Sequence, residues 1–296
     1  MTVPVGAVVV RYRGGEEVAR CLASLLGHGG GVPERIVLVD SGSGDGGAAA
    51  LAGRFPEVRV VELGENRSFA HAANRGAREA GGGFVLLLNP DAEVEAGALA
   101  PLVDHLERNP ELTGVVPLLV GPDGRPQHRW QLRRLPTERD LARGRPGRPA
   151  YPAPPRAPGP VAQPAAAAWL LRREAWEALG GFDEAYAPAW WEDVDLCARR
   201  AARRAAGDAR VGDGFRVLPA SRVRHLGGVS ASELGPEAFL PLYFRNLVRY
   251  ARRHHPERAD GIQRSLERTL LLRALVRPGR ARAYLAARRA LRTAGE

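Results

Sequence analysis

The most unusual polar residues in this chain form a short acidic run directly after two adjacent tryptophans. Trp190 and Trp191 precede Glu192, Asp193 and Asp195. A flat aromatic ring beside a carboxylate suits a sugar ligand, because the ring stacks on the sugar while the carboxylate binds a hydroxyl group or takes its proton. The structural alternative is that the helix dipole favours these acids in a first turn and that both rings pack in a core.

Asp91 is a second candidate carboxylate, and it follows the apolar segment 84–88 in the sequence Asn89-Pro90-Asp91. A strand made only of apolar residues is buried on both faces, so we expect its end to lie in a central cleft. A carboxylate there suits a divalent cation that bridges a diphosphate, because Mg²⁺ takes few protein oxygens and completes its shell with phosphate and water. A helix cap before a helix over residues 95–108 is an equally sound interpretation.

A glycine-rich segment with two carboxylates, Asp40 and Asp45, follows the second expected strand. Gly42, Gly44 and Gly47 have the GxGxxG spacing of dinucleotide-binding loops, which is a weak signal by itself. Asp45 would place a negative charge inside a phosphate cradle, so the two carboxylates fit the hydrogen-bond donors of a base or a ribose better. A flexible turn with solvated acids is the structural alternative.

Alternating strands and helices must position these residues. Apolar runs predict strands at residues 5–10, 36–39, 58–61, 84–88, 165–171 and 215–218. Helical spacing predicts helices at residues 18–26, 68–80, 95–108, 173–179 and 192–206, and from residue 239 onward with breaks near 255–256 and 278–279. This alternation predicts an α/β fold with a mostly parallel, doubly wound sheet that binds ligands beyond the carboxyl ends of its strands. Residues 122–164, rich in Pro, Arg and Gly, are expected to form a long mobile loop or an acceptor-side insertion.

The positive charge of the chain is concentrated at its C-terminal end. The 296 residues include no lysine and carry a formal net charge of +10. Residues 245–296 hold 14 arginines against 4 acids, so the whole excess lies there. Such a block is typical of contact with an anionic membrane surface or with nucleic acid.

The first helix of this basic arm has an amphipathic pattern. Its apolar stripe lies beside several arginines, which favours a helix at the surface of a membrane, although packing on the main domain explains the stripe equally well. The stripe consists of Leu240, Tyr243, Phe244, Leu247, Val248 and Ala251.

No apolar run reaches the roughly 20 residues of a membrane span, and we expect no secretory signal. The two cysteines lack the spacing of a zinc site or a disulfide framework, which fits a cytoplasmic protein.

Several of these motifs, taken in chain order, resemble those of the family 2 glycosyltransferases with the GT-A fold, especially the branch similar to rhamnosyltransferases. The resemblance covers residues 8–230. Its motifs are Val8-Val9-Val10-Arg11-Tyr12, Val39-Asp40-Ser41-Gly42-Ser43-Gly44-Asp45-Gly46, Asn66-Arg67-Ser68-Phe69-Ala70 with Asn74 and Gly76, Leu88-Asn89-Pro90-Asp91, Gly180-Gly181-Phe182-Asp183-Glu184, Glu192-Asp193-Val194-Asp195-Leu196, and the segment 225–230.

The resemblance implies a fold and a role for each matching residue. Residues 1–235 would form a GT-A domain with a mixed sheet flanked by helices, and residues 236–296 a basic helical arm. Asp91 and His225 would hold Mg²⁺ or Mn²⁺, and Asp193 would be the catalytic base with Glu192 beside it. Trp190 and Trp191 are expected to bind the acceptor. The residues expected to bind the donor are Val10, Tyr12, Asp40, Ser43, Asp45, Asn66, Asn74 and Asn89.

This sequence departs from the family pattern at two positions. Arg11 stands where the family often has Asn after the first strand, and Asn89 stands at the usually acidic first position of the metal motif. Asp91 is therefore the only acidic ligand in that motif. Members near this branch often carry the same Asn-Pro-Asp form.

The activity that the resemblance implies is sugar transfer with inversion from a nucleoside-diphosphate donor to a saccharide acceptor. By resemblance the donor would be dTDP-rhamnose, with UDP-hexoses as the next choice, and the acceptor a polyprenyl-linked saccharide of a bacterial envelope polymer. One alternative is a nicotinamide-dependent oxidoreductase that uses the loop of Gly42, Gly44 and Gly47. A second alternative is a nucleic-acid-binding protein that uses the basic arm, although we expect no nucleic acid as a partner because that function leaves the acidic motifs unexplained.

Overall fold

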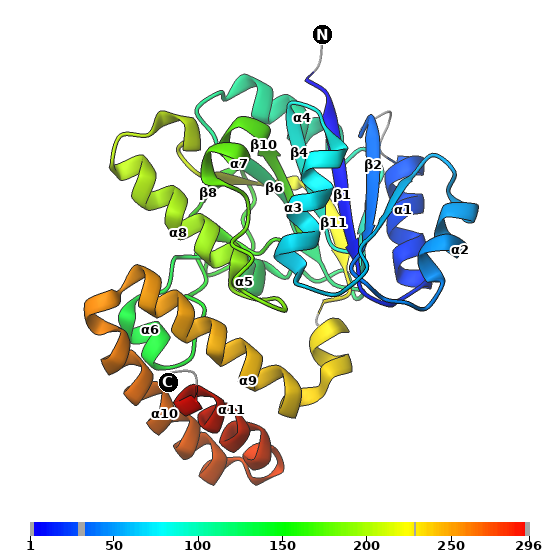
Figure 1. Ribbon diagram of the computed structural model, residues 1–296. Helices are drawn as coiled ribbons and strands as arrows, with labels where there is room; N and C mark the ends of the chain where they lie inside the picture. Colours follow the sequence, from blue (N-terminus) through cyan, green and yellow to red (C-terminus); the bar gives the residue numbers. More distant parts are fainter. Residues whose placement is uncertain (1–2, 29–32, 228, 294–296) are drawn as a thin grey trace.

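Four parallel strands form one half of the central sheet in the computed structural model, which describes residues 3–28, 33–227 and 229–293 (Figure 1). Their order is β3 (Arg59–Glu62), β2 (Arg35–Asp40), β1 (Val5–Arg11) and β4 (Phe84–Leu88). Every residue of β1 and β4 is buried, as expected for apolar strands in the middle of a sheet. The connecting helices are α1 (Glu16–His28), α2 (Gly47–Arg54) and α3 (Phe69–Ala80).

The other half of the sheet is mixed in direction. Strand β10 (Ala168–Arg172) pairs antiparallel with β4, and the order continues through β6 (Gly114–Val120), β11 (Phe215–His225) and β5 (Ala92–Val94). The expectation of a mostly parallel sheet is therefore wrong for this half, although the predicted mixed α/β fold flanked by helices is confirmed. The antiparallel pairing brings His225, at the end of β11, beside Ala92, one residue after Asp91.

Helices cover both faces of the sheet, and each face has its own apolar core. Helix α1 and helix α4 (Leu99–Arg108) pack on one face, where Leu22, Leu38 and Leu102 are buried. Helix α3 packs on the other face, where helix α7 (Arg173–Leu179) and helix α8 (Glu192–Ala205) also contribute buried residues. Trp169 fills the centre of this second core. A short 3-10 helix, η1 (Ala209–Val211), precedes β11.

Residues 122–164 contain more regular structure than the sequence suggested. They form α5 (His128–Gln131), β7 (Leu132–Arg133), α6 (Glu138–Ala142), β8 (Gly159–Val161) and β9 (Gln163–Pro164). Buried polar side chains hold the segment in place: Gln131 accepts from the backbone of Leu119 at 2.9 Å and donates to the backbone of Pro117 at 2.6 Å. These elements fit the expected insertion better than the expected mobile loop, because hydrogen bonds anchor the segment although it has no apolar period.

The C-terminal arm consists of α9 (Val229–His254), α10 (Ala259–Val276) and α11 (Ala281–Thr293), separated by the short turns η2 (Pro256–Arg258) and η3 (Pro278–Arg280). The breaks fall where the sequence predicted them. Gly235, with φ of 70°, interrupts α9 next to the expected domain boundary at residues 235–236. No helix within the described ranges is long and apolar enough to cross a membrane.

The apolar stripe of α9 faces inward. Phe244, Leu247, Val248 and Ala251 are buried in a third apolar cluster together with residues of α8, α10 and α11. The interpretation of this stripe as a membrane-facing surface is therefore wrong, and packing on the protein explains it. In Figure 1 the arm lies on the side of the sheet toward which β1 runs, so it faces the carboxyl ends of the parallel strands.

Candidate active site

A buried arginine joins the ends of the first two strands. Arg11 and Asp40 are the last residues of β1 and β2 and lie in register as neighbours. The Arg11 guanidinium, 1% exposed, donates to Asp40 and forms two hydrogen bonds with Asp45 at 2.7 and 2.9 Å. The departure from the family pattern at Arg11 therefore has a structural role, because the guanidinium neutralises two carboxylates of the glycine-rich loop.

The glycine-rich loop is held in one shape by this arrangement. Ser43 donates its backbone N–H to Asp40 Oδ1 at 2.8 Å. Gly42 has φ of +72°, and a Cβ there would lie 2.4 Å from the backbone of Glu65, so only glycine fits. The hydrogen bonds from Arg11 lower the pKa of Asp45, and they raise the pKa of Arg11 although burial opposes this.

The structure gives Asp40 a different role from the expected contact with the nucleotide base. Asp40 is 3% exposed, and both of its oxygens already accept hydrogen bonds, from Arg11 and from the Ser43 backbone. Its carboxylate shapes the loop instead of presenting a free oxygen to a ligand. Asp45, which lies on the exposed side of Arg11, is the better placed of the two acids for a contact with the donor.

Other predicted donor-binding residues gather around this loop at the carboxyl edge of the sheet. Ser43 Oγ accepts from the backbone N–H of Arg13 at 2.7 Å, and Ser41 Oγ donates to Asn66 Oδ1 at 3.1 Å. Tyr12 is 48% exposed, whereas the side chain of Val10 is buried. The structure therefore brings Tyr12, Ser43 and Asn66 to one side of the sheet, and their contact with a donor stays a prediction.

Asn74 does not join this group. Its Nδ2 donates to the Phe182 carbonyl at 2.9 Å and to Glu184 Oε1 at 3.1 Å, and its Oδ1 accepts from the Phe182 backbone N–H at 2.9 Å. Both N–H donors of the amide are thus used inside the protein. The expected contact of Asn74 with the donor is corrected to a structural one, which fastens α3 to the turn around Phe182.

Asp91 and His225 lie together, as the antiparallel pairing of β5 and β11 requires. Asp91 Oδ2 accepts from the backbone N–H of Gly227 at 3.0 Å, and Oδ1 lies 3.4 Å from His225 Nε2. Asn89 Nδ2 lies 3.4 Å from the same ring nitrogen. Burial opposes ionisation of Asp91, but the hydrogen bonds and charge of its neighbours outweigh burial and lower its pKa, so the group is a carboxylate at neutral pH.

Gln127, which the sequence analysis did not single out, determines which nitrogen of His225 is free. Gln127 Nε2 donates to the His225 carbonyl at 2.9 Å, so its Oε1 faces His225 Nδ1, also at 2.9 Å. An amide oxygen only accepts, so Nδ1 donates to Gln127, and Nε2 is the ring nitrogen that faces Asp91. Trp130 stacks on the imidazole with the two rings 5.3 Å apart and 19° from parallel.

This pair of acceptors fits a divalent cation. His225 Nε2 and Asp91 Oδ1 lie 3.4 Å apart, and a divalent cation could take the place of a proton between them. Within the described part of the chain there is no group of three or more His, Cys, Asp or Glu side chains that could hold a metal ion. The protein would therefore supply few ligands, as is usual for Mg²⁺ beside a diphosphate.

Asp193 lies at the start of α8 among several hydrogen-bond donors. Its Oδ2 accepts from Gln163 Nε2 at 3.2 Å and from the Ala166 backbone N–H at 3.3 Å, and Arg133 lies 3.9 Å away. Burial raises the pKa of Asp193, while the charge of Arg133 opposes that rise. A carboxylate with a raised pKa is the form that a general base takes in many enzymes.

Glu192 is buried beside Asp193, and its Oε2 has no hydrogen-bond partner among the described residues. Burial raises the pKa of Glu192 well above its usual value, and the neighbouring charge of Asp193 raises it further. Two adjacent carboxyl groups do not both ionise readily, and the pKa is raised further for Glu192 than for Asp193. Asp193 is therefore the better suited of the two to act as the base, and a catalytic role of Glu192 stays a prediction.

Asp195 points away from this pair and into the junction with the arm. It is fully buried and accepts from Arg199 Nε at 2.6 Å, lies 2.8 Å from His254 Nε2, and accepts from the Tyr186 hydroxyl at 3.2 Å. Burial opposes ionisation, but these partners and the charges of Arg199 and Arg253 lower the pKa of Asp195. Asp195 is thus a structural anion between α8 and α9.

The two tryptophans are also part of this junction. Trp191 is 2% exposed and contacts Tyr243 and Tyr250 of α9, with ring centroids 5.5 and 5.3 Å apart. The expected stacking of Trp191 on an acceptor is wrong, because its ring lies in the core. Trp190 is partly exposed and packs edge-on against Phe239, so an acceptor contact of Trp190 stays a prediction.

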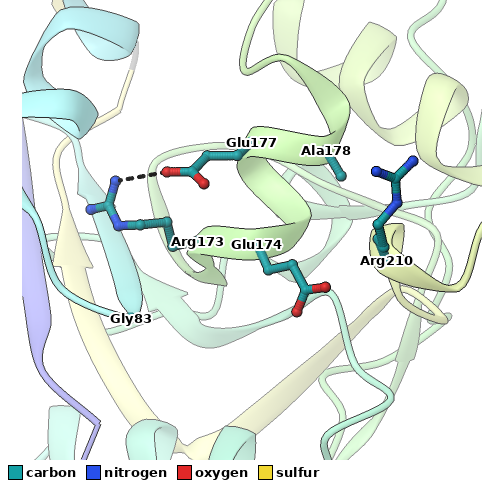
Figure 2. A pocket seen from close by; sticks show the side chains of 6 residues that line it. All are labelled: Gly83, Arg173, Glu174, Glu177, Ala178 and Arg210. Atoms are coloured by element: carbon teal, nitrogen blue, oxygen red, sulfur yellow. Dashed lines mark ion pairs between the residues drawn. The ribbon is translucent and has the colours of Figure 1, made fainter.

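A surface pocket elsewhere in the molecule contains none of the predicted site residues. Figure 2 shows it around α7, lined by Gly83, Arg173, Glu174, Glu177, Ala178 and Arg210. Gly83 precedes β4, so the pocket lies at the amino end of that strand, opposite the edge that carries Asp91. Arg173 donates to the carbonyls of Ala77, Gly81 and Gly82, which makes it a structural residue. We therefore assign the active site to the carboxyl edge.

Comparison with known proteins agrees with this geometry. The family model described as Glycosyl transferase family 2 matches residues 7–179, more than half of the chain. The chain belongs to glycosyltransferase family 2. It is therefore a glycosyltransferase, and the carboxyl edge with Asp91, His225 and Asp193 is its candidate active site.

The relatives of this family 2 chain include bacterial enzymes of polysaccharide synthesis. It is 32% identical over 223 residues to the N-acetylglucosaminyl-diphospho-decaprenol L-rhamnosyltransferase of Mycobacterium tuberculosis, covering 66% of this chain and 70% of that protein. It is 28% identical over 246 residues to the O-antigen biosynthesis protein RfbC of Myxococcus xanthus, covering 77% of this chain but 18% of that protein.

Solved structures share the fold of this family 2 chain. GalNAc-T7 with UDP, GalNAc and Mn²⁺ superposes with a TM-score of 0.58 at 18% identity, covering 83% of this chain and 48% of the other. The mannosyltransferase PcManGT from Pyrobaculum calidifontis, in complex with GDP-Man and Mn²⁺, superposes with a TM-score of 0.57 at 18% identity, covering all of this chain and 86% of the other. These likenesses confirm the predicted GT-A fold.

Proposed function

We propose that this glycosyltransferase moves a sugar from a nucleoside diphosphate to a saccharide carried on a polyprenyl diphosphate, with inversion at the anomeric carbon. Rhamnose is the first choice of sugar. The dTDP-sugar is the first choice of donor and the UDP-sugar the second. The identity of 32% to a mycobacterial rhamnosyltransferase supports the choice of substrates. The observation that carries the mechanism is the position of Asp193, a partly exposed carboxylate with a raised pKa at the carboxyl edge of the sheet.

The proposed step is a single displacement in which the acceptor oxygen attacks as it loses its proton to Asp193. A sugar hydroxyl is a weak nucleophile, so removal of this proton by a positioned carboxylate speeds the reaction by roughly 10² to 10⁴. The Ala166 backbone N–H and Gln163 Nε2 fix the carboxylate, and the charge of Arg133 favours its ionised form. The bond between the anomeric carbon and the diphosphate oxygen breaks, and the nucleoside diphosphate leaves.

The leaving diphosphate needs a counter-charge, and Asp91 with the Nε2 of His225 is the pair of ligands we assign to Mg²⁺ or Mn²⁺. Such a cation, when bound, neutralises charge on the departing diphosphate. Asn89 and the Gly227 backbone hold the two ligands in place by their contacts with His225 and Asp91. The glycine-rich loop with Asp45 lies at the same edge and is proposed to bind the nucleoside.

The test is a transfer assay with a defined acceptor and a panel of donors. We expect transfer of rhamnose from dTDP-rhamnose to a polyprenyl-diphosphate N-acetylglucosamine in the presence of Mn²⁺ or Mg²⁺, and an inverted linkage by NMR of the product. Thermal-shift measurements with dTDP, UDP and GDP, each with and without Mn²⁺, identify the base independently of the acceptor. Transfer from UDP-hexoses alone would contradict the choice of donor, and a retained configuration would contradict the mechanism.

A further inference from the structure

The end of helix α10 carries an exposed apolar patch that the fold leaves uncovered. Its side chains are large and aliphatic, and three of them, Leu272, Leu275 and Val276, are 62, 71 and 73% exposed. We define the α10 patch as Leu271, Leu272, Leu275 and Val276. These four residues lie within one and a half turns of one helix, whereas the other exposed large hydrophobic residues, Tyr12, Leu26, Trp130 and Leu234, belong to separate segments of the chain.

The patch is a consequence of how α10 packs. Successive residues of a helix lie about 100° apart, so the four patch residues occupy a sector of about 140°. The buried residues Ile262, Leu266, Leu270 and Ala274 lie on the opposite side and pack into the arm. Helix α10 therefore has two apolar sides, one buried in the arm and one, the α10 patch, exposed.

Arginines lie before and after the α10 patch along the chain. Arg264 and Arg268 lie on the same face one to two turns earlier, and Arg277, Arg280 and Arg282 follow in and after the turn η3. All five are exposed, and none forms an ion pair within the described residues. The acid nearest to the face, Glu267, is paired with Arg292 at 3.3 Å, and Asp260 lies in the first turn of α10.

We propose that the α10 patch inserts into the surface of an anionic lipid bilayer, with the surrounding arginines bound to its headgroups. Aliphatic side chains bordered by cations are the composition of interfacial membrane contacts, in which the apolar residues sink about 5–10 Å below the headgroups. Each arginine near an anionic surface adds to the attraction, and exposed arginines without an acidic partner are free to do so.

A second copy of the chain is a poorer partner for this patch. A two-fold interface would place the same residues of both copies opposite each other. The arginines around one patch would then face those around the other, and like charges repel. The patch contains no aromatic residue on which a nucleic-acid base would stack. Charge complementarity therefore favours an anionic bilayer.

The position of the patch is compatible with catalysis at the membrane. The turn between α10 and α11 lies at the end of the arm away from the sheet in Figure 1, so a bilayer there leaves the carboxyl edge accessible. The inference rests on the proposed function in one respect: membrane binding by the α10 patch would bring the enzyme to a lipid-linked acceptor. Its evidence is the exposure and the charge of the arm.

The experiment measures binding of the full-length protein to vesicles of phosphatidylcholine mixed with phosphatidylglycerol, and to vesicles of phosphatidylcholine alone. The test variant is Leu272→Glu with Leu275→Glu, and the matched control is Leu26→Glu, an exposed leucine of α1 that is 40% exposed. We expect the double variant to bind mixed vesicles at least about tenfold more weakly, and the control to bind as the wild type does. Replacing Arg277 and Arg280 by Gln should weaken binding to the mixed vesicles only.

Equal binding of the double variant and the wild type to mixed vesicles would overturn the proposal. A dimer in sedimentation velocity that the double variant dissociates, with vesicle binding unchanged, would assign the patch to self-association instead. If the double variant unfolds at a lower temperature than the wild type, Leu272→Ser with Leu275→Ser replaces it in the same assay. Sugar transfer to a water-soluble acceptor is measured in parallel. If the wild type transfers no sugar, the proposed function is contradicted, but the result of the vesicle assay still holds.

Discussion

The side-chain oxygen of Gln127 accepts a hydrogen bond from His225 Nδ1 at 2.9 Å, and this contact directs Nε2 of His225 toward Asp91. The orientation of the Gln127 amide is itself fixed, because its Nε2 donates to the His225 carbonyl. A residue 98 positions away in the sequence therefore sets the tautomer of the proposed metal ligand.

We predict that Gln127→Met weakens Mn²⁺ binding by roughly 10 to 100 times, the usual effect of losing a partner that orients a metal ligand. The measurement is calorimetric titration of Mn²⁺ in the presence of dTDP or UDP. Gln263→Met, in α10, is the control, because the hydrogen bonds of Gln263 join it to Arg252, Glu267 and Leu291, which all belong to the arm. An unchanged affinity in the Gln127 variant would show that Gln127 does not position His225.

Asp91→Asn tests the proposed metal site directly. The variant keeps the size of the side chain and its contact with Gly227 but removes the charge. We expect the gain in nucleoside-diphosphate affinity on adding Mn²⁺ to disappear, while the affinity without metal changes little. Thermal shifts with and without Mn²⁺ report both values, and an undiminished effect of Mn²⁺ would rule out Asp91 as a ligand.

Asp193→Asn is predicted to lower kcat at least about a hundredfold while donor binding stays nearly unchanged, because the variant removes the base but keeps its size. Rapid-quench measurement of a single turnover isolates the chemical step. Asp104→Asn, an exposed residue of α4, is the control. If Asp193→Asn keeps more than about a tenth of the wild-type rate in that step, less than the usual loss for a general base, the base is another residue.

Arg133 is predicted to set the lower pH limit of catalysis. Burial raises the pKa of Asp193 and the charge of Arg133 lowers it, so Arg133→Gln should raise it further. Since only the ionised form of Asp193 accepts a proton, kcat rises with pH through this pKa, and the acidic limb of the profile should move to higher pH in the variant. Arg134→Gln, the next residue along the chain, is the control. An acidic limb that stays in place would contradict the interaction.

Asp195→Ala is predicted to lower the free energy of unfolding by about 1.5 to 3 kcal/mol, because it removes a fully buried anion that accepts hydrogen bonds from Arg199 and Tyr186. Urea denaturation measures the loss, and Asp104→Ala, which breaks the exposed pair with Arg108, should cost at most about 0.5 kcal/mol. The pKa of Asp195 is lowered in the folded protein, so its contribution is complete above its unfolded pKa of about 3.9 and is lost as the pH falls through the lowered value. Equal losses in the two variants would contradict a structural role for Asp195.

The sequence predicted the four strands of the parallel half of the sheet and the helices α1 and α3 from local patterns, but it did not predict α2. Strand β4 is wholly apolar, and Ser68 caps the start of α3 because its hydroxyl accepts from the His71 backbone. The motifs around Asp91 and Asp193 were likewise visible as short local patterns. The comparisons then confirmed the family and the fold that these motifs indicated.

The remaining features depend on pairings between distant residues, which a local pattern does not contain. Gln127 and Gln163 lie in a segment without apolar periodicity, yet they contact His225 and Asp193. Trp191 was expected at the surface because it adjoins acids, but α9 covers it. Arg11 looked like a departure from a motif until the register of β1 and β2 placed it between two carboxylates.

Asp193 and Asp195 stand two residues apart on the same helix, and the second is clamped to His254 and Arg253 at the far end of α9. The boundary near residue 235 divides the sequence, but contacts across it hold the helix that carries the proposed base. Cutting the chain there would expose Trp191 and remove His254 and Arg253 from Asp195, two residues from Asp193. The arm therefore supports the proposed catalytic site, and a shortened protein made for assay or crystallisation would lose the contacts that hold α8 in place.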